Sequence, residues 1–284
     1  MTTPVGSFND IGRSARDILV RDYSIGGFKL DIKTTTSNGS SFKMNGHRDN
    51  KTGVIVGSIE SRYTNKKTGL SLTQAWTSSN HLNSKIELEN KLARGLKLEA
   101  TVFVSPSVRE KNIRLNTTFR RPNIYTTTSF DTFKRNLVVN SAIGLQGVLI
   151  GGEVVYNMRD AKINCYNTAV GYSTRDYAIT IHAANNFSKY IASYYHRLDK
   201  TLQASGKVTW NNNKSAVEVE IGAKYNLDPT SFIKGKITNT GVVCASFTQC
   251  IRPGVKMNMG IAMDTTCWNE SINPKFGIAL TLEN

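Results

Sequence analysis

The sequence of 284 residues has few of the side chains on which metalloenzymes and disulfide-stabilised secreted proteins depend. Its four cysteines lack the CxxC spacing of a zinc or redox site, and its four histidines are isolated from one another. No nucleophile with a nearby base, no carboxylate pair and no glycine-rich phosphate loop stands out. We therefore expect free thiols, no metal, no cofactor and no enzymatic activity; the cysteines and histidines are Cys165, Cys244, Cys250, Cys267, His47, His81, His182 and His196.

Long hydrophobic runs are also missing. No stretch of about 18 uncharged apolar residues occurs, which argues against a transmembrane helix. The nearest approach, residues 136–152, is interrupted by polar side chains and by Gly144, and it predicts two strands with a turn between them. Six charged residues among the first 25 lead us to expect no secretory signal.

Positive charge is abundant but not concentrated. The formal net charge of +15 predicts an anionic partner, whether nucleic acid, a membrane surface or small anions. A nucleic-acid-binding protein usually gathers its basic residues in a stripe or a tail. Here lysine and arginine are scattered from Arg13 to Lys275, with no run longer than Lys66-Lys67. We therefore expect no nucleic-acid partner.

The pattern that dominates the chain is alternation of apolar and polar residues. In residues 95–104, GLKLEATVFV, the even positions are apolar, whereas the odd positions include Lys97 and Glu99. Successive residues of a strand face opposite sides, so one side is apolar and the other is charged. About nineteen such segments follow one another without a linker, separated by turn-forming residues. Examples are residues 28–33, 85–89, 113–120, 217–224, 255–263 and 275–282.

The number of strands determines what the two faces contact. An all-β domain of about 19 strands predicts a sheet closed on itself, and a barrel of that size leaves an aqueous lumen. Charged faces cannot be buried dry, so they line the water, and the apolar faces contact lipid. Membrane-spanning strands of about 9–11 residues fit the chain length. The alternative is a soluble basic β-protein that binds carbohydrate or nucleic acid, which solubility without detergent would reveal.

Residues 7–22 depart from the alternation and predict a helix. Ser7 and Asp10 form a pattern like a capping box at its start, and Gly26-Gly27 ends it before the first strand. Such a helix lies on a membrane surface, in a core, or inside the lumen with its apolar stripe against the wall. The stripe consists of Phe8, Ile11, Ala15, Ile18 and Leu19.

Four segments carry a resemblance to a known family: DIGRSARDIL (10–19), FKLDIKTTTSNG (28–39), GLSLTQAW (69–76) and KLARGLKLEA (91–100). They resemble the mitochondrial porins, the voltage-dependent anion channels, and the likeness covers nearly the whole chain. It implies the nineteen-stranded barrel known for this family, with parallel first and last strands and the helix inside the pore. It also implies a voltage-gated, weakly anion-selective channel of the mitochondrial outer membrane for ATP, ADP, phosphate and chloride.

Lumen-facing positions hold more basic than acidic residues, which raises the local concentration of anions. Inward acids partly offset this excess, so we expect weak selectivity. The resemblance adds a nucleotide contact at Lys97, because Gly95-Leu96-Lys97 resembles a triplet that the family associates with nucleotides. Arg13 and Arg16 are further candidates for contact with nucleotides. The candidates for pore lining and anion selectivity are Arg13, Arg16, Arg21, Lys29, Lys33, Lys97, Arg114, Arg120, Lys207, Lys224, Lys234, Lys236 and Lys256.

The resemblance assigns further roles to single positions. We divide the chain into residues 1–25, the helix and hinge, and residues 26–284, the barrel, with the hinge at Gly26 and Gly27. Gln74 is a lipid-facing polar position where many animal members carry a glutamate, so glutamate-dependent partner binding or dimer effects are not expected. Gating contacts between helix and wall are expected at Ile11, Ala15 and Ile18. A signal for the outer-membrane assembly machinery is expected at Lys275, Gly277, Leu280 and Leu282.

The expected partners follow from the same resemblance. They are the lipid bilayer, nucleotides and small anions as permeants, and the outer-membrane assembly machinery. A homo-oligomer and the docking of cytosolic kinases are compatible with a channel and are left open.

Overall fold

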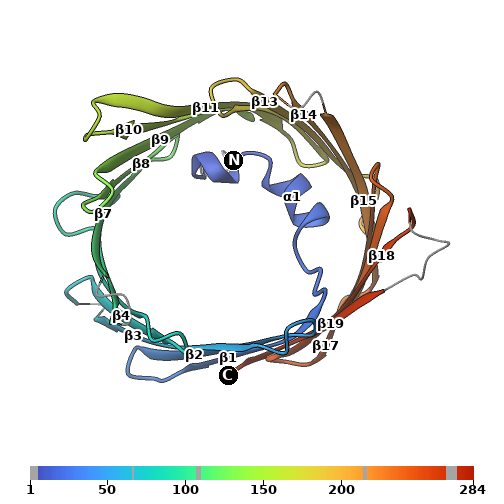
Figure 1. Ribbon diagram of the computed structural model, residues 1–284, viewed down its shortest axis with the longest axis horizontal. Helices are drawn as coiled ribbons and strands as arrows, with labels where there is room; N and C mark the ends of the chain where they lie inside the picture. The colour runs from blue at the N-terminus through green and yellow to red at the C-terminus, as the bar shows by residue number, and fades with distance from the viewer. Residues whose placement is uncertain (1–5, 66, 107–109, 214–215, 267–273) are drawn as a thin grey trace.

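Nineteen strands and a short N-terminal helical segment make up the computed structural model, which describes residues 6–65, 67–106, 110–213, 216–266 and 274–284. The strands form one closed ring with the helical segment inside it (Figure 1), which confirms the predicted barrel. The strands are β1 (Gly27–Thr35), β2 (Ser40–Asp49), β3 (Ile55–Asn65), β4 (Leu70–Thr77), β5 (Leu82–Glu89), β6 (Leu96–Ser105), β7 (Glu110–Arg120), β8 (Ile124–Asp131), β9 (Asn136–Leu145), β10 (Val148–Asn157), β11 (Lys162–Ser173), β12 (Tyr177–Ala184), β13 (Lys189–Arg197), β14 (Leu202–Asn211), β15 (Ala216–Asp228), β16 (Ser231–Thr238), β17 (Val242–Arg252), β18 (Val255–Asp264) and β19 (Lys275–Glu283).

The ring closes between its first and last strands. β1 and β19 pair in parallel, with Phe28 opposite Ile278 and Ile32 opposite Leu282, whereas every other neighbouring pair is antiparallel. An odd number of strands requires one parallel pair, because successive hairpins reverse direction at each turn. The parallel closure implied by the resemblance is therefore confirmed.

The apolar faces of the strands point outward. In β12, Ile179 and Ile181 are 46% and 56% exposed, whereas Ala178 and Thr180 are buried on the inner face. The chain thus has an apolar belt outside instead of a conventional core. Such a belt is stable against lipid and not against water.

The N-terminal segment is a broken helix. A 3₁₀ turn, η1 (Phe8–Asp10), begins with a hydrogen bond from the Ser7 N–H to the Asp10 carboxylate at 2.9 Å, and the helix α1 (Arg13–Leu19) follows. The helix predicted within residues 7–22 is therefore confirmed, but it is shorter and is divided into these two parts. Gly12 lies between the two parts with a left-handed φ of 76°, and a Cβ there would lie 2.9 Å from the Thr180 hydroxyl oxygen of β12. No helix in the described part of the chain is long and apolar enough to span a membrane.

The cysteines have no disulfide partner where they are described. Cys165, Cys244 and Cys250 are free thiols, and Cys267 lies outside the described residues.

Candidate functional site: the pore interior

The N-terminal segment lies on small and apolar residues of the inner wall. Phe8 and Ile11 pack with Ala142 of β9 and Ala169 of β11. Gly151 of β10 gives them room, because a Cβ there would lie 2.8 Å from the Phe8 ring. Close approach of the segment to this part of the wall therefore depends on residues with little or no side chain.

The helix α1 continues this packing toward β15. Ala15 and Ile18 pack with Ala178 of β12 and Tyr195 of β13, and Leu19 is fully buried. The structure thus places the three predicted gating contacts, Ile11, Ala15 and Ile18, against the wall. Their role in gating stays a prediction.

The end of α1 meets a buried lysine. Lys234 of β16 donates from Nζ to the carbonyl oxygens of Asp17 and Arg21, at 2.7 and 3.2 Å, and to the Asp22 carboxylate at 2.9 Å. The pKa of the Asp22 carboxyl lies below its usual value. Burial alone would raise it, but the hydrogen bond from Lys234 and the positive charges of Lys234, Lys256 and Arg21 lower it by more.

The linker between α1 and β1 lies flat on the wall. A Cβ at Gly260 of β18 would overlap the carbonyl oxygen of Ser24, and one at Gly277 of β19 would lie 2.8 Å from it. Of the two predicted hinge residues, Gly26 has a left-handed φ of 79° and open space around it, whereas Gly27 is buried beside the Arg48 carbonyl. The Gly26 N–H donates to the Phe276 carbonyl and its carbonyl accepts from the Asn50 N–H, both at 3.0 Å, and the role of Gly26 and Gly27 as a hinge stays a prediction.

Across β3 to β6, which the segment does not cover (Figure 1), charged residues line the wall. The buried carboxylate of Glu87 accepts from Arg62, Lys85 and Lys97 at 2.9, 2.7 and 2.9 Å. The Glu99 carboxylate lies 3.0 Å from Lys85 and 3.5 Å from Lys97. These three cations and two carboxylates form one network on the lumenal face.

Most of the predicted pore-lining cations have an acidic partner. Arg16 instead donates to the Asn9 carbonyl at 2.6 Å, and the Nζ of Lys224 lies 4.2 Å from the centroid of the Phe232 ring. Arg120 has no ion pair within the described ranges. The cations that pair with a carboxylate are Arg13, Arg21, Lys29, Lys33, Lys97, Arg114, Lys207, Lys234, Lys236 and Lys256.

Sequence patterns did not reveal the partners at the end of α1. Asp22 follows the helix, where the alternation of a strand assigns no face. Asn258 of β18 is one of many uncharged polar residues, and its residue type does not distinguish it from the others. Asn258 nevertheless donates to the Asp22 carbonyl at 2.7 Å and accepts from the Ser24 N–H at 3.2 Å. The sequence signal available was the inward parity of Asn258, which it shares with Lys256.

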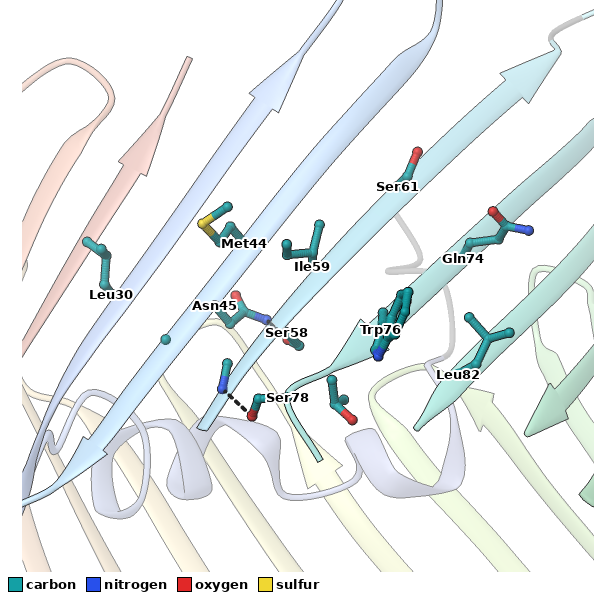
Figure 2. A pocket seen from close by; sticks show the side chains of 14 residues that line it. Leu30, Met44, Asn45, Ser58, Ile59, Ser61, Gln74, Trp76, Ser78 and Leu82 are labelled. Carbon is teal, nitrogen blue, oxygen red and sulfur yellow. Dashed lines mark hydrogen bonds between the residues drawn. The ribbon is translucent and has the colours of Figure 1, made fainter. Parts of the chain in front are cut away.

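On the outer face, Gln74 of β4 lies beside an apolar hollow. Figure 2 shows Gln74 near Ser61 and Trp76, with Met44 and Ile59 across the hollow. Gln74 pairs in register with Ser61, so two polar side chains lie together within the apolar belt. The structure thus places Gln74 on the outer face, and its contact with lipid stays a prediction.

The four residues of the predicted assembly signal divide between the faces of β19. Leu280 and Leu282 lie opposite Leu30 and Ile32 of β1, on the apolar face. Gly277 lies on the inner face against Ser24, and Lys275 shares its parity. No group of His, Cys, Asp or Glu residues suited to a metal ion occurs in the ranges that the structure describes.

Comparison with known proteins agrees with this architecture. The model of the eukaryotic porin family matches residues 4–277. The mitochondrial outer membrane protein porin of Neurospora crassa is 33% identical over 283 residues, which cover 99% of each chain. The non-selective voltage-gated ion channel VDAC2 of Meleagris gallopavo is 31% identical over 282 residues, which cover 98% of this chain and 94% of that protein.

Among solved structures, a triple mutant of Rhodopseudomonas blastica porin aligns with a TM-score of 0.50 and 9% identity, over 84% of this chain and 98% of its own. That likeness shows a shared barrel fold alone. The family model and the full-length relatives show more: the chain belongs to the eukaryotic porin family.

Proposed function

We propose that this chain is a voltage-gated channel of the mitochondrial outer membrane that conducts nucleotides and small anions with weak anion selectivity. The observation that carries the proposal is a closed barrel with an apolar outer face and charged inner residues around a helical segment. The names of the two relatives, an outer-membrane porin and a voltage-gated channel, support the location and the gating. An apolar outer belt is incompatible with the soluble alternative.

A weak preference for anions follows from incomplete pairing of the lumenal cations. In the network around Glu87, three cations share two carboxylates, which leaves a formal charge of +3 − 2 = +1. At the other side, Lys234 and Lys256 share the carboxylate of Asp22, which leaves +2 − 1 = +1. Fixed positive charge in a water-filled pore concentrates anions. The excess is small, which fits a relative that is named non-selective.

The three candidate nucleotide contacts differ in their partners. Arg13 lies 3.5 Å from Asp10 and 3.6 Å from Asp17, and Lys97 binds Glu87. A phosphate group would compete with these carboxylates for either cation. Arg16 binds a backbone carbonyl instead, so its charge is not cancelled. In this proposal Arg16 is therefore the strongest of the three contacts.

The apolar belt makes the lipid bilayer the first partner of the chain. Residues 1–25 and 26–284 act as helix with hinge and as barrel in this proposal. The assembly signal at the C-terminus, a homo-oligomer and docking of cytosolic kinases stay predictions. No enzymatic step and no cofactor enters the proposed function.

Reconstitution of the purified chain in a planar bilayer tests the proposal. Under a salt gradient we expect a reversal potential of the anion-preferring sign but small size, and closure as the voltage rises. A cation-preferring sign would contradict the argument from lumenal charge. Absence of any conductance would contradict the channel itself.

A further inference from the structure

The helical segment in the pore carries no net charge of its own. Residues 6–25 contain three arginines and three aspartates, so their formal charges of +3 and −3 cancel. A transmembrane voltage does work on charge that moves across the field. A rigid displacement of this segment alone therefore gives the voltage no net charge on which to act.

Lys234 of β16 joins this neutral segment to the wall. An ammonium group has three protons, and Lys234 directs hydrogen bonds to three acceptors of the segment: the carbonyls of Asp17 and Arg21 and the carboxylate of Asp22. Lys234 is 3% exposed, so these acceptors and not water stabilise its charge. Withdrawal of the segment would break all three hydrogen bonds and leave the ammonium group to the water of the lumen.

Asn258 of β18 holds the residues that follow. Its side-chain nitrogen donates to the Asp22 carbonyl at 2.7 Å and to the Thr248 hydroxyl at 2.6 Å, and its oxygen accepts from the Ser24 N–H at 3.2 Å. Both the nitrogen and the oxygen of the Asn258 side chain are therefore hydrogen-bonded. The linker is bound at its backbone, directly after the point where Lys234 binds.

We propose that Asp22, Lys234 and Asn258 form a clamp that joins the helical segment to β16–β18, so that voltage moves helix and wall as one unit. The wall then supplies the charge that the segment lacks, with Lys236 on β16 and Lys256 on β18 in addition to Lys234. The clamp lies between α1 and Gly26, so the predicted hinge cannot release the helix while the clamp holds. The inference rests on the proposed voltage-gated function.

The variant Asp22→Asn distinguishes the clamp from the alternative in which only the total charge of the moving unit matters. The variant removes one negative charge, so a moving unit without a clamp would gain positive charge and close with a steeper voltage dependence. The clamp predicts the opposite, because the segment loses its strongest bond to Lys234 and uncouples from the wall. We therefore expect a shallower voltage dependence of closure in a planar bilayer. A steeper or unchanged dependence overturns the proposal.

Lys234→Met and Lys224→Met form a matched pair. The two lysines lie opposite each other in register on β15 and β16, and each change removes one positive charge from the same part of the pore. Lys224 has no ion pair or hydrogen bond to the segment among the described residues. We expect similar shifts of reversal potential in both variants, but a larger loss of steepness in Lys234→Met. Equal loss in both variants overturns the clamp. If Lys234→Met does not insert, Asp22→Asn carries the test.

The mobility of a spin label at position 20 reports on the clamp in a measurement that does not depend on gating. Val20 directly follows α1 and is 57% exposed, so a label there disturbs little packing. In the full chain, with the four native cysteines replaced by serine, we expect a more mobile label in Asp22→Asn than in the parent. Unchanged mobility overturns the clamp. If the parent channel shows no voltage closure, the proposed function fails, while label mobility still decides whether the clamp exists.

Discussion

The inner wall has two regions that carry the same alternating strands but different inward residues. Beneath the helical segment the wall offers Ala142, Gly151 and Ala169, on which apolar side chains pack. Across the uncovered strands it offers Glu87 and its basic partners. The first region contacts protein and the second contacts water. Alternation thus determines which residues face inward. Small residues lie where apolar side chains of the segment pack, whereas charged residues face water or, as Lys234 does, polar groups of the segment.

Filling the covered region is expected to give the largest effect. Gly151→Val would place a Cβ 2.8 Å from Phe8 and 2.9 Å from Ile11, so η1 must leave the wall. Overpacking of this kind costs about 1–3 kcal/mol. Limited proteolysis of the reconstituted channel should then cut near residue 8 faster than in the parent.

Gly152→Val provides the matched control for this region. Gly152 is the next residue of β10 and faces outward, where the nearest atom to an added Cβ is the Asn167 carbonyl oxygen at 3.8 Å. We expect parental proteolysis in this variant. Equal protection of both valine variants would mean that close packing on Gly151 does not hold the segment.

Removing the central carboxylate of the uncovered region is expected to have a smaller effect on stability and a clear one on selectivity. Glu87→Gln leaves Lys85 and Lys97 with Glu99 as their shared acid and takes from Arg62 its carboxylate partner, at a cost of about 1–2 kcal/mol. The reversal potential under a salt gradient should shift toward stronger anion preference.

Glu89→Gln is the control for charge alone. Glu89 lies two residues further along the same face of β5, is exposed, and has no ion pair within the described part of the chain. Its removal should shift the reversal potential less and leave thermal stability unchanged. An equal change in both variants would show that the network around Glu87 contributes no more to selectivity and stability than a single exposed carboxylate does.

The two regions also show how far sequence can predict this fold. Period-two alternation predicted the closed barrel and the inward file that contains Lys97 and Lys234, because strand geometry alone sets which way a side chain points. It did not predict that the helix breaks at Gly12, where an added Cβ would lie 2.9 Å from the Thr180 hydroxyl oxygen of the wall. Nor did it predict the partners of Asp22. Lys234 is 212 residues away in the sequence, and only closure of the ring brings the two side chains together.

Arg16 allows a finer comparison between paired and unpaired cations. In Arg16→Gln, block of chloride conductance by added ATP should weaken by up to about fivefold, the effect of losing an exposed charge contact worth about 1 kcal/mol or less. Arg13→Gln should weaken it less, because Asp10 and Asp17 already offset the Arg13 charge. A larger effect of Arg13→Gln would contradict the ranking of these two contacts.

The smallest expected effect concerns pH and the Asp22 carboxyl. Its pKa in the folded channel lies below the usual 3.8, held there by the charged groups that face it, Lys234, Lys256 and Arg21. A depressed pKa contributes stability that is complete above the unfolded value and is lost as the pH falls through the folded value. Between pH 7 and pH 5 the contribution of Asp22 therefore stays constant, and the difference in label mobility at position 20 between the parent and Asp22→Asn should stay constant as well. Below pH 3.8 the parent should approach the variant, because protonated Asp22 no longer carries the charge that binds Lys234. Convergence already at pH 5 would show that a different titrating group holds the segment.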